Sequence, residues 1–140
     1  MVCLGNICRS PLAEGIMRHL AKKQNLDWEI ASAGTGNWHI GQAPDRRSIA
    51  AAQNCGYDIS LQIAQQFSPA MFSQYDWILV MDRKNLSDVK NLAGTKEAQQ
   101  KVKLFLEDDE LIDPYWDDDL FAPVCKQVEE RCKEIIKELS

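Results

Sequence analysis

Apolar residues recur at helical spacing in two stretches of the chain. After Ser10-Pro11, a pair typical of a helix start, Leu12, Ile16 and Leu20 recur every four residues and predict a helix with one buried stripe. A long helix is predicted to close the chain from about residue 122, and its buried face comprises Val124, Val128, Cys132, Ile135 and Leu139. Both helices therefore need an apolar surface to pack against.

Two further helices are predicted from the residues at their ends. Asp45 can cap a helix that runs to Cys55, and Gly56 then supplies its C-terminal stop. Asp82 precedes another helix, which runs to about Leu92.

Short apolar segments between these helices predict strands. Residues 77–81 form an uninterrupted apolar run, as expected of a strand covered on both faces. Residues 28–31 and 102–106 predict two more strands, and the first of these ends in a turn at residues 32–34. Alternating strands and helices predict an α/β fold, with a doubly wound parallel sheet that carries helices on both faces. We expect a single three-layer domain over residues 1–140.

Composition and charge narrow the class of protein. A chain of 140 residues with 45% hydrophobic and 26% charged residues can build a core of ordinary size. The net charge of −5 argues against a nucleic-acid partner, which would favour a basic face. No apolar run is long enough to span a membrane, and no signal peptide opens the chain. The five cysteines do not suggest a secreted disulfide scaffold, so we expect a cytoplasmic protein with free thiols.

The first ten residues, MVCLGNICRS, carry the clearest chemistry. A loop that curls into a helix start points several N–H groups at one spot, where the helix dipole adds positive potential. Gly5 permits a tight turn, Asn6 tolerates a left-handed conformation, and Arg9 can place two hydrogen bonds on phosphate oxygens. The predicted phosphate-binding residues are Leu4, Gly5, Asn6, Ile7, Cys8, Arg9 and Ser10.

Cys3 lies at the mouth of this loop. Surroundings that favour negative charge would hold it as a thiolate, which can attack phosphorus and form a covalent intermediate. Ser10 could donate its hydroxyl to the thiolate and help it depart in the second step. The arrangement suits phosphate monoesters and needs no cofactor, and no set of cysteines and histidines has the spacing of a zinc site.

The string VCLGNICRSP resembles the signature of low-molecular-weight protein tyrosine phosphatases. Further matches follow in the family's order and rough spacing along nearly the whole chain. They are SAGT at residues 32–35, PDRRS at 44–48, MD at 81–82 and DPY at 113–115.

The resemblance implies a role for each matching residue. Cys3 is the expected nucleophile, Arg9 binds phosphate and steadies the transition state, and Asp113 is the general acid and then the general base. Trp38 and Tyr115 are expected to line the substrate pocket. Asn6 and Ser10 are expected to support the loop and the thiolate, and Asp82 to support the same loop.

The resemblance also assigns a redox role to the second cysteine of the loop. Cys8 is expected to form a reversible disulfide with Cys3 that protects the nucleophile from further oxidation. The alternative for Cys8 is a small buried residue with no chemistry.

The chain departs from the family pattern in three places. Relatives begin with an apolar strand that leads into the catalytic loop, and here only residues 1–2 precede Cys3, so the first strand is missing or truncated. We expect the natural chain to start upstream or another strand to fill the central gap. Gln65 stands where the family often has arginine, and Trp116 where many relatives have a second tyrosine.

The sequence therefore predicts an enzyme that hydrolyses phosphotyrosine in proteins or peptides, and small aryl phosphates. A phosphoarginine phosphatase on the same scaffold is the nearest alternative, but that subgroup typically has threonine at the position of Ile7. An arsenate reductase would need two further cysteines to relay a disulfide, and residues 56–124 contain none. A non-catalytic phosphate-binding or thiol-sensing module is a third alternative, if the short first strand abolishes activity.

Overall fold

A four-stranded parallel sheet forms the centre of the computed structural model, which describes residues 1–140. The strands lie in the order β2-β1-β3-β4, and every neighbouring pair is parallel. Their bounds are β1 Val2–Cys3, β2 Ala33–Gly34, β3 Ile78–Val80 and β4 Val102–Leu104. This arrangement confirms the predicted α/β fold.

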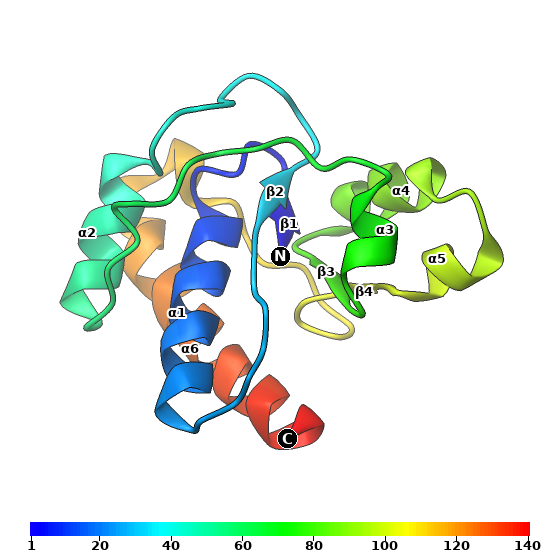
Figure 1. Ribbon diagram of the computed structural model, residues 1–140. Helices are drawn as coiled ribbons and strands as arrows, with labels where there is room; N and C mark the ends of the chain where they lie inside the picture. Colours follow the sequence, from blue (N-terminus) through cyan, green and yellow to red (C-terminus); the bar gives the residue numbers. More distant parts are fainter.

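Helices cover both faces of the sheet (Figure 1). The α-helices are α1 Arg9–Lys23, α2 Arg46–Asn54, α3 Met71–Gln74, α4 Arg83–Leu92, α5 Lys96–Gln100 and α6 Phe121–Leu139, and the 3₁₀ turns are η1 Pro114–Trp116 and η2 Asp118–Leu120. In Figure 1, α1, α2 and α6 lie on one side of the strands, and α3, α4 and α5 lie on the other. None of the helices combines the length and apolar character needed to cross a bilayer.

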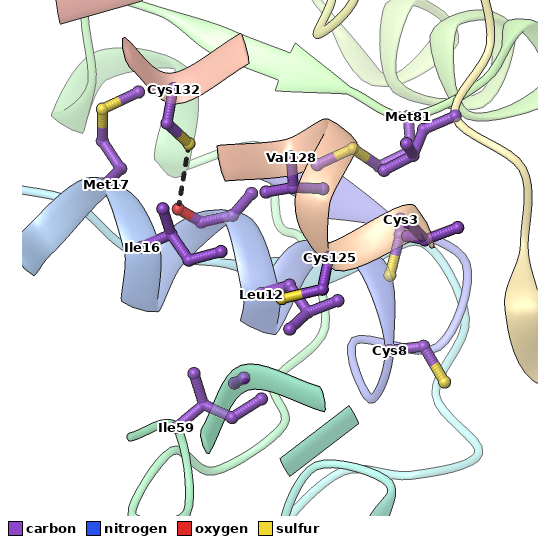
Figure 2. Close-up of a cluster of buried hydrophobic side chains, with 14 of the residues drawn as sticks. Cys3, Cys8, Leu12, Ile16, Met17, Ile59, Met81, Cys125, Val128 and Cys132 are labelled. Atoms are coloured by element: carbon purple, nitrogen blue, oxygen red, sulfur yellow. Dashed lines mark hydrogen bonds between the residues drawn. The ribbon is translucent and has the colours of Figure 1, made fainter. Parts of the chain in front are cut away.

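The larger core lies between the sheet and the α1/α6 layer. Leu12 and Ile16 of the predicted α1 stripe are fully buried, and Val128 and Cys132 of α6 pack in the same cluster (Figure 2). Leu139, predicted on the buried face of α6, is instead 41% exposed. It lies at the last turn of α6, where the helix borders an open cavity rather than the core.

A smaller core fills the opposite face of the sheet. Ile78 and Val80 point into it beside Val89 of α4, whereas Leu79 between them packs against the larger core. Strand β3 is therefore covered on both faces, as its uninterrupted apolar sequence predicts.

The predicted helix ends are largely confirmed. Asp45 caps α2 by accepting a 2.8 Å hydrogen bond from the Arg47 N–H, and Gly56 adopts a left-handed φ of 94° after the helix. Asp82 caps α4 in the same way. Ser10 differs from the prediction, because α1 begins at Arg9 and Ser10 lies within its first turn. Its hydroxyl is thereby free for contacts with the preceding loop.

The predicted strand at 28–31 is wrong, and its residues run alongside the sheet without strand pairing. The paired residues are Ala33 and Gly34, which were predicted to form a turn. Strand assignment needs a partner, and β1 begins only at Val2, so residues 28–30 have no partner strand to pair with.

The central strand β1, between β2 and β3, is present but only two residues long, which confirms a truncated first strand. No other strand fills the gap, which overturns that part of the prediction. A cavity of about 490 Å³ adjoins β1, and its lining includes Met1, Val2 and residues 27–33 and 74–79.

Candidate active site

The 4–10 loop begins at the carboxyl end of β1 and runs into the first turn of α1. Strand β1 lies between β2, reached by the first crossover, and β3, reached by the second, so the sheet order changes direction here. In open α/β sheets, ligands bind outside the carboxyl ends of strands at such a switch point. The topology therefore places the predicted phosphate-binding residues where a ligand site is expected.

Asn6 holds the loop in shape. Its backbone is left-handed, with a φ of 57°, a conformation that asparagine tolerates. Its side-chain Nδ2 donates to the hydroxyls of Ser10 at 2.7 Å and Ser32 at 2.9 Å. Its side-chain Oδ1 accepts the backbone N–H of Gln65 at 3.0 Å. Because Asn6 is only 3% exposed, these bonds satisfy a polar side chain that water barely reaches.

The Cys3 sulfur lies against two hydrogen-bonding groups. The Asn6 N–H donates to Sγ over 3.3 Å, and the Ser10 hydroxyl lies 3.0 Å from it. Ser10 Oγ already accepts from Asn6, and its other acceptor, the Ala33 carbonyl, is 3.5 Å away. The geometry therefore favours donation from the Ser10 hydroxyl to the Cys3 sulfur.

Arg9 is buried, at 3% exposure, and its guanidinium is fixed by two acceptors. Its Nη1 donates to the Asp82 carboxylate at 2.8 Å and to the Leu111 carbonyl at 3.0 Å. Burial alone would lower the pKa of Arg9, but Cys3 and the carboxylates of Asp82 and Asp113 raise it above the ordinary value. Arg9 therefore stays cationic, and its Nη2 donates no hydrogen bond within the protein.

Asp113, which is far from Arg9 in the sequence, lies close to the Arg9 guanidinium. Its Oδ2 lies 3.6 Å from Arg9 Nη2, and its Oδ1 accepts the N–H of Tyr115 at 3.1 Å. Pro114, at the first position of η1, is buried and fixes the turn. The side chain of Asp113 is 36% exposed, so one carboxylate oxygen is anchored and the other faces Arg9 and solvent.

Apart from that of Asn6, the N–H groups of the 4–10 loop have no acceptor within the protein. They belong to the segment that curls into the N-terminus of α1, where unpaired donors and the helix dipole favour an anion. The loop can therefore receive phosphate oxygens through its backbone N–H groups and through the side chain of Arg9.

Comparison with known proteins identifies the family. Residues 1–140 match the family model described as low molecular weight phosphotyrosine protein phosphatase. The chain belongs to this family.

Individual relatives agree with this assignment. The chain is 36% identical to the low molecular weight protein-tyrosine-phosphatase YfkJ of Bacillus subtilis, over 96% of this chain and 90% of that protein. It is also 36% identical to the human low molecular weight phosphotyrosine protein phosphatase, over 97% of this chain and 91% of that one. A crystal structure of a protein tyrosine phosphatase from Entamoeba histolytica superposes with a TM-score of 0.92 at 30% identity, covering 99% of this chain and 93% of that one. The protein is therefore a phosphatase.

Trp38, the predicted pocket wall, lies in a loop that adjoins the 4–10 loop. The N–H of Gly36 donates to the Leu4 carbonyl, and the Trp38 ring packs so closely on Gly36 that a Cβ there would lie 1.9 Å from it. His39, beside Trp38, approaches Gly5. Trp38 itself is 65% exposed, so it borders the site rather than filling it.

Two departures from the family pattern have clear local roles. Gln65, in place of arginine, donates from its side-chain amide to the Ser32 carbonyl at 2.9 Å, while its backbone N–H binds Asn6. Trp116, in place of tyrosine, is 88% exposed. Its ring packs edge-on against the Tyr115 ring, with 4.9 Å between the ring centroids. Tyr115 and Trp116 therefore form an aromatic pair directly after Asp113 and Pro114.

Cys8 is buried within the 4–10 loop and is a free thiol, as is Cys3. Burial raises its pKa, and the nearby negative charges of Asp45, Cys3 and Asp113 raise it further. Its carbonyl accepts the Ser48 hydroxyl at 3.1 Å, which ties the loop to α2. Cys8 is therefore a neutral thiol at ordinary pH.

The sequence did not point to three supporting residues. Glu14 accepts a 2.8 Å hydrogen bond from the Ser32 hydroxyl, which in turn accepts from Asn6. Ser48 holds Cys8, and Arg47 reaches the segment after Asp113. Each contact joins distant parts of the chain, and the only available signal was the unexplained PDRRS string at 44–48.

Proposed function

We propose that this phosphatase hydrolyses phosphotyrosine in proteins or peptides, and small aryl phosphates, through a cysteinyl-phosphate intermediate. One observation carries the proposal: the Arg9 guanidinium lies in the same site as the Cys3 sulfur and 3.6 Å from the Asp113 carboxylate. A nucleophile, a phosphate-binding cation and a proton donor are the groups that this reaction requires.

In the first step, the Cys3 thiolate attacks phosphorus and the bond to the phenolic oxygen breaks. The loop N–H groups and Arg9 bind the three non-bridging oxygens as their charge develops. Asp113, in its protonated form, gives its proton to the departing phenolate. The products are the free tyrosine hydroxyl, the phosphorylated cysteine and an ionised Asp113.

In the second step, Asp113 acts as the base. It removes a proton from a water molecule that attacks phosphorus, the sulfur–phosphorus bond breaks, and Cys3 leaves as a thiolate. The Ser10 hydroxyl, 3.0 Å from Cys3 Sγ, stabilises the departing sulfur by donating a hydrogen bond. Inorganic phosphate is released, and the enzyme returns to its starting state.

The same loop supports a protective redox role for its two cysteines. A peroxide oxidises the Cys3 thiolate to a sulfenic acid, and Cys8 then displaces water to form the Cys3–Cys8 disulfide. A thiol reductant returns both residues to free thiols. The disulfide prevents oxidation of Cys3 to the irreversible sulfinic and sulfonic acids.

The decisive experiment measures hydrolysis of an aryl phosphate and of a phosphotyrosine peptide by four variants. Cys3→Ser is expected to abolish turnover, and Asp113→Asn to slow it by about 10²–10⁴-fold because the leaving group loses its proton donor. Cys55→Ser and Asp109→Asn, which alter the same residue types outside the site, should retain full activity.

Rival functions give different outcomes in the same assay. Turnover of a phosphoarginine peptide but not of phosphotyrosine would replace the proposed substrate class. Binding of inorganic phosphate without turnover of any ester would show a binding module. Equal activity in Cys3→Ser and the unmutated chain would overturn the mechanism itself.

A further inference from the structure

The side chain of Arg47 connects the two halves of the candidate active site. Its helix, α2, is attached to the 4–10 loop by two hydrogen bonds: the Asp45 N–H donates to the Ile7 carbonyl at 2.8 Å, and the Ser48 hydroxyl donates to the Cys8 carbonyl. Its guanidinium reaches the 113–118 segment, which carries Asp113. Figure 1 shows the segment that leads into α6 passing beside α2.

The guanidinium is held rigidly from its own helix. Asp45 forms a bidentate pair with it, in which Arg47 Nε donates to Oδ1 at 3.0 Å and Nη2 donates to Oδ2 at 2.9 Å. The same Oδ1 accepts the Arg47 backbone N–H. These bonds lower the pKa of Asp45, so the carboxylate stays ionised and keeps its bidentate pair with Arg47. One nitrogen, Nη1, is left to point at the 113–118 segment.

Nη1 makes two hydrogen bonds there. It donates to the Tyr115 carbonyl at 3.0 Å and to the Asp118 carboxylate at 2.6 Å. The guanidinium also lies over the Phe121 ring at 4.5 Å and the Tyr115 ring at 5.3 Å. Asp118 is 81% exposed, so its ion pair is screened by water and contributes little. The contacts that fix the segment are therefore those to Tyr115.

Tyr115 is two residues from Asp113, and its N–H binds the Asp113 carboxylate. We propose that Arg47 is a positioning residue that sets the distance of the general acid Asp113 from the phosphate-binding loop. The inference rests on the proposed function, because it assigns Arg47 to the proton-transfer step of that reaction. Arg47 touches no reacting atom and acts only through Tyr115.

The test compares Arg47→Gln with Arg46→Gln, because Arg46 is the adjacent arginine and is exposed on the same helix. Each variant is assayed for kcat/KM on two aryl phosphates, one with a weakly acidic phenol and one with a strongly acidic phenol that leaves without a proton. Arg47→Gln should lower kcat/KM roughly 10- to 100-fold on the weakly acidic phenol, as expected for a misplaced catalytic group. The effect should largely disappear on the strongly acidic phenol.

A purely structural role would give a different pattern. Equal losses on both substrates would show general damage to phosphate binding, and no loss on either would show that Asp113 needs no support from Arg47. Both results overturn the proposal. Arg47→Lys keeps the positive charge but cannot form the bidentate pair with Asp45. It should therefore recover only part of the activity lost in Arg47→Gln. Arg46→Gln should match the unmutated enzyme on both substrates.

A readout without turnover separates this proposal from the proposed function. Hydrogen–deuterium exchange in residues 113–118 should rise in Arg47→Gln and stay unchanged in Arg46→Gln, whether or not the protein hydrolyses phosphotyrosine. Unchanged exchange in Arg47→Gln would overturn the positioning role. Failure of the unmutated chain to hydrolyse any aryl phosphate, with the exchange difference present, would overturn only the catalytic assignment.

Discussion

At the scale of single residues, Asn6 controls the shape of the 4–10 loop through both its backbone and its side chain. The left-handed backbone turns the loop, and the amide links Ser10, Ser32 and the backbone of Gln65. Ser10 in turn lies 3.0 Å from the Cys3 sulfur, so the side chain of Asn6 orients the hydroxyl that contacts it.

We predict that Asn6→Ala lowers the free energy of unfolding by about 3 kcal/mol, because it removes three hydrogen bonds of a buried side chain and puts alanine in a left-handed conformation. Asn25→Ala is the matched control. Asn25 has a φ of 58° but is exposed, so only the backbone cost of about 1 kcal/mol should appear. Urea denaturation measures both, and equal losses would show that the side-chain bonds of Asn6 contribute nothing.

The residues predicted from sequence share one property: they belong to short local strings. Cys3, Arg9 and Ser10 lie within eight positions, and a loop that precedes a helix brings them together whatever follows. The partnership of Arg9 with Asp82 spans 73 positions and came only from the family resemblance. The role of Glu14 was missed because nothing local shows that a helical carboxylate is buried beside Ser32.

At the scale of elements, helices were predicted more accurately than strands. Caps such as Asp45 and Asp82 act within three residues of themselves, so the sequence alone locates them. No strand formed at the predicted residues 28–31 because pairing depends on a partner, and β1 begins only at Val2. Ala33 and Gly34 pair because they lie opposite Val2 and Cys3.

Strand β2 ends in direct contact with the 4–10 loop, and Gly34 makes that contact possible. A Cβ at Gly34 would lie 2.9 Å from the Leu4 carbonyl oxygen and 3.0 Å from the Asn6 nitrogen, which are backbone atoms with little freedom to move. The SAGT string therefore has a steric reason for its glycine.

We predict that Gly34→Ala destabilises the protein by about 1–3 kcal/mol and weakens inhibition by inorganic phosphate, because the added methyl group displaces the loop. Gly94→Ala is the control, since nothing lies within 4 Å of the added carbon and its φ is not left-handed. Thermal unfolding and phosphate inhibition constants measure the two effects. Normal phosphate inhibition in Gly34→Ala would show that the loop tolerates the methyl group.

At the scale of the whole molecule, helix α1 connects the site to the larger core. Its first residue, Arg9, binds Asp82 in the candidate active site, while Leu12 and Ile16 pack in the core cluster that includes α6. Cys132 of α6 is fully buried against α1, where its thiol lies 3.9 Å from the Ala13 carbonyl (Figure 2). Burial raises the pKa of Cys132 well above that of an exposed thiol.

Because Cys132 is buried, the free energy of unfolding is expected to fall as the pH becomes alkaline. Cys132 stays protonated in the folded protein, whereas in the unfolded chain it ionises above about pH 8.5. Its contribution is therefore fully present below that pH and is lost as the pH rises toward the folded pKa. Cys125, whose pKa burial raises to about 12, and Cys8 add to the loss in the same direction.

We predict that the free energy of unfolding falls between pH 7.5 and 9.5, with Cys132 accounting for about 1 kcal/mol of the loss. Urea denaturation in a thiol reductant at the two pH values measures it. Cys132→Ala should be less stable at both pH values because of the cavity, but its loss between them should be smaller by that amount. An identical pH dependence in Cys132→Ala would contradict the assignment, and Cys55→Ala, at a partly exposed thiol, shows how much a less buried cysteine contributes.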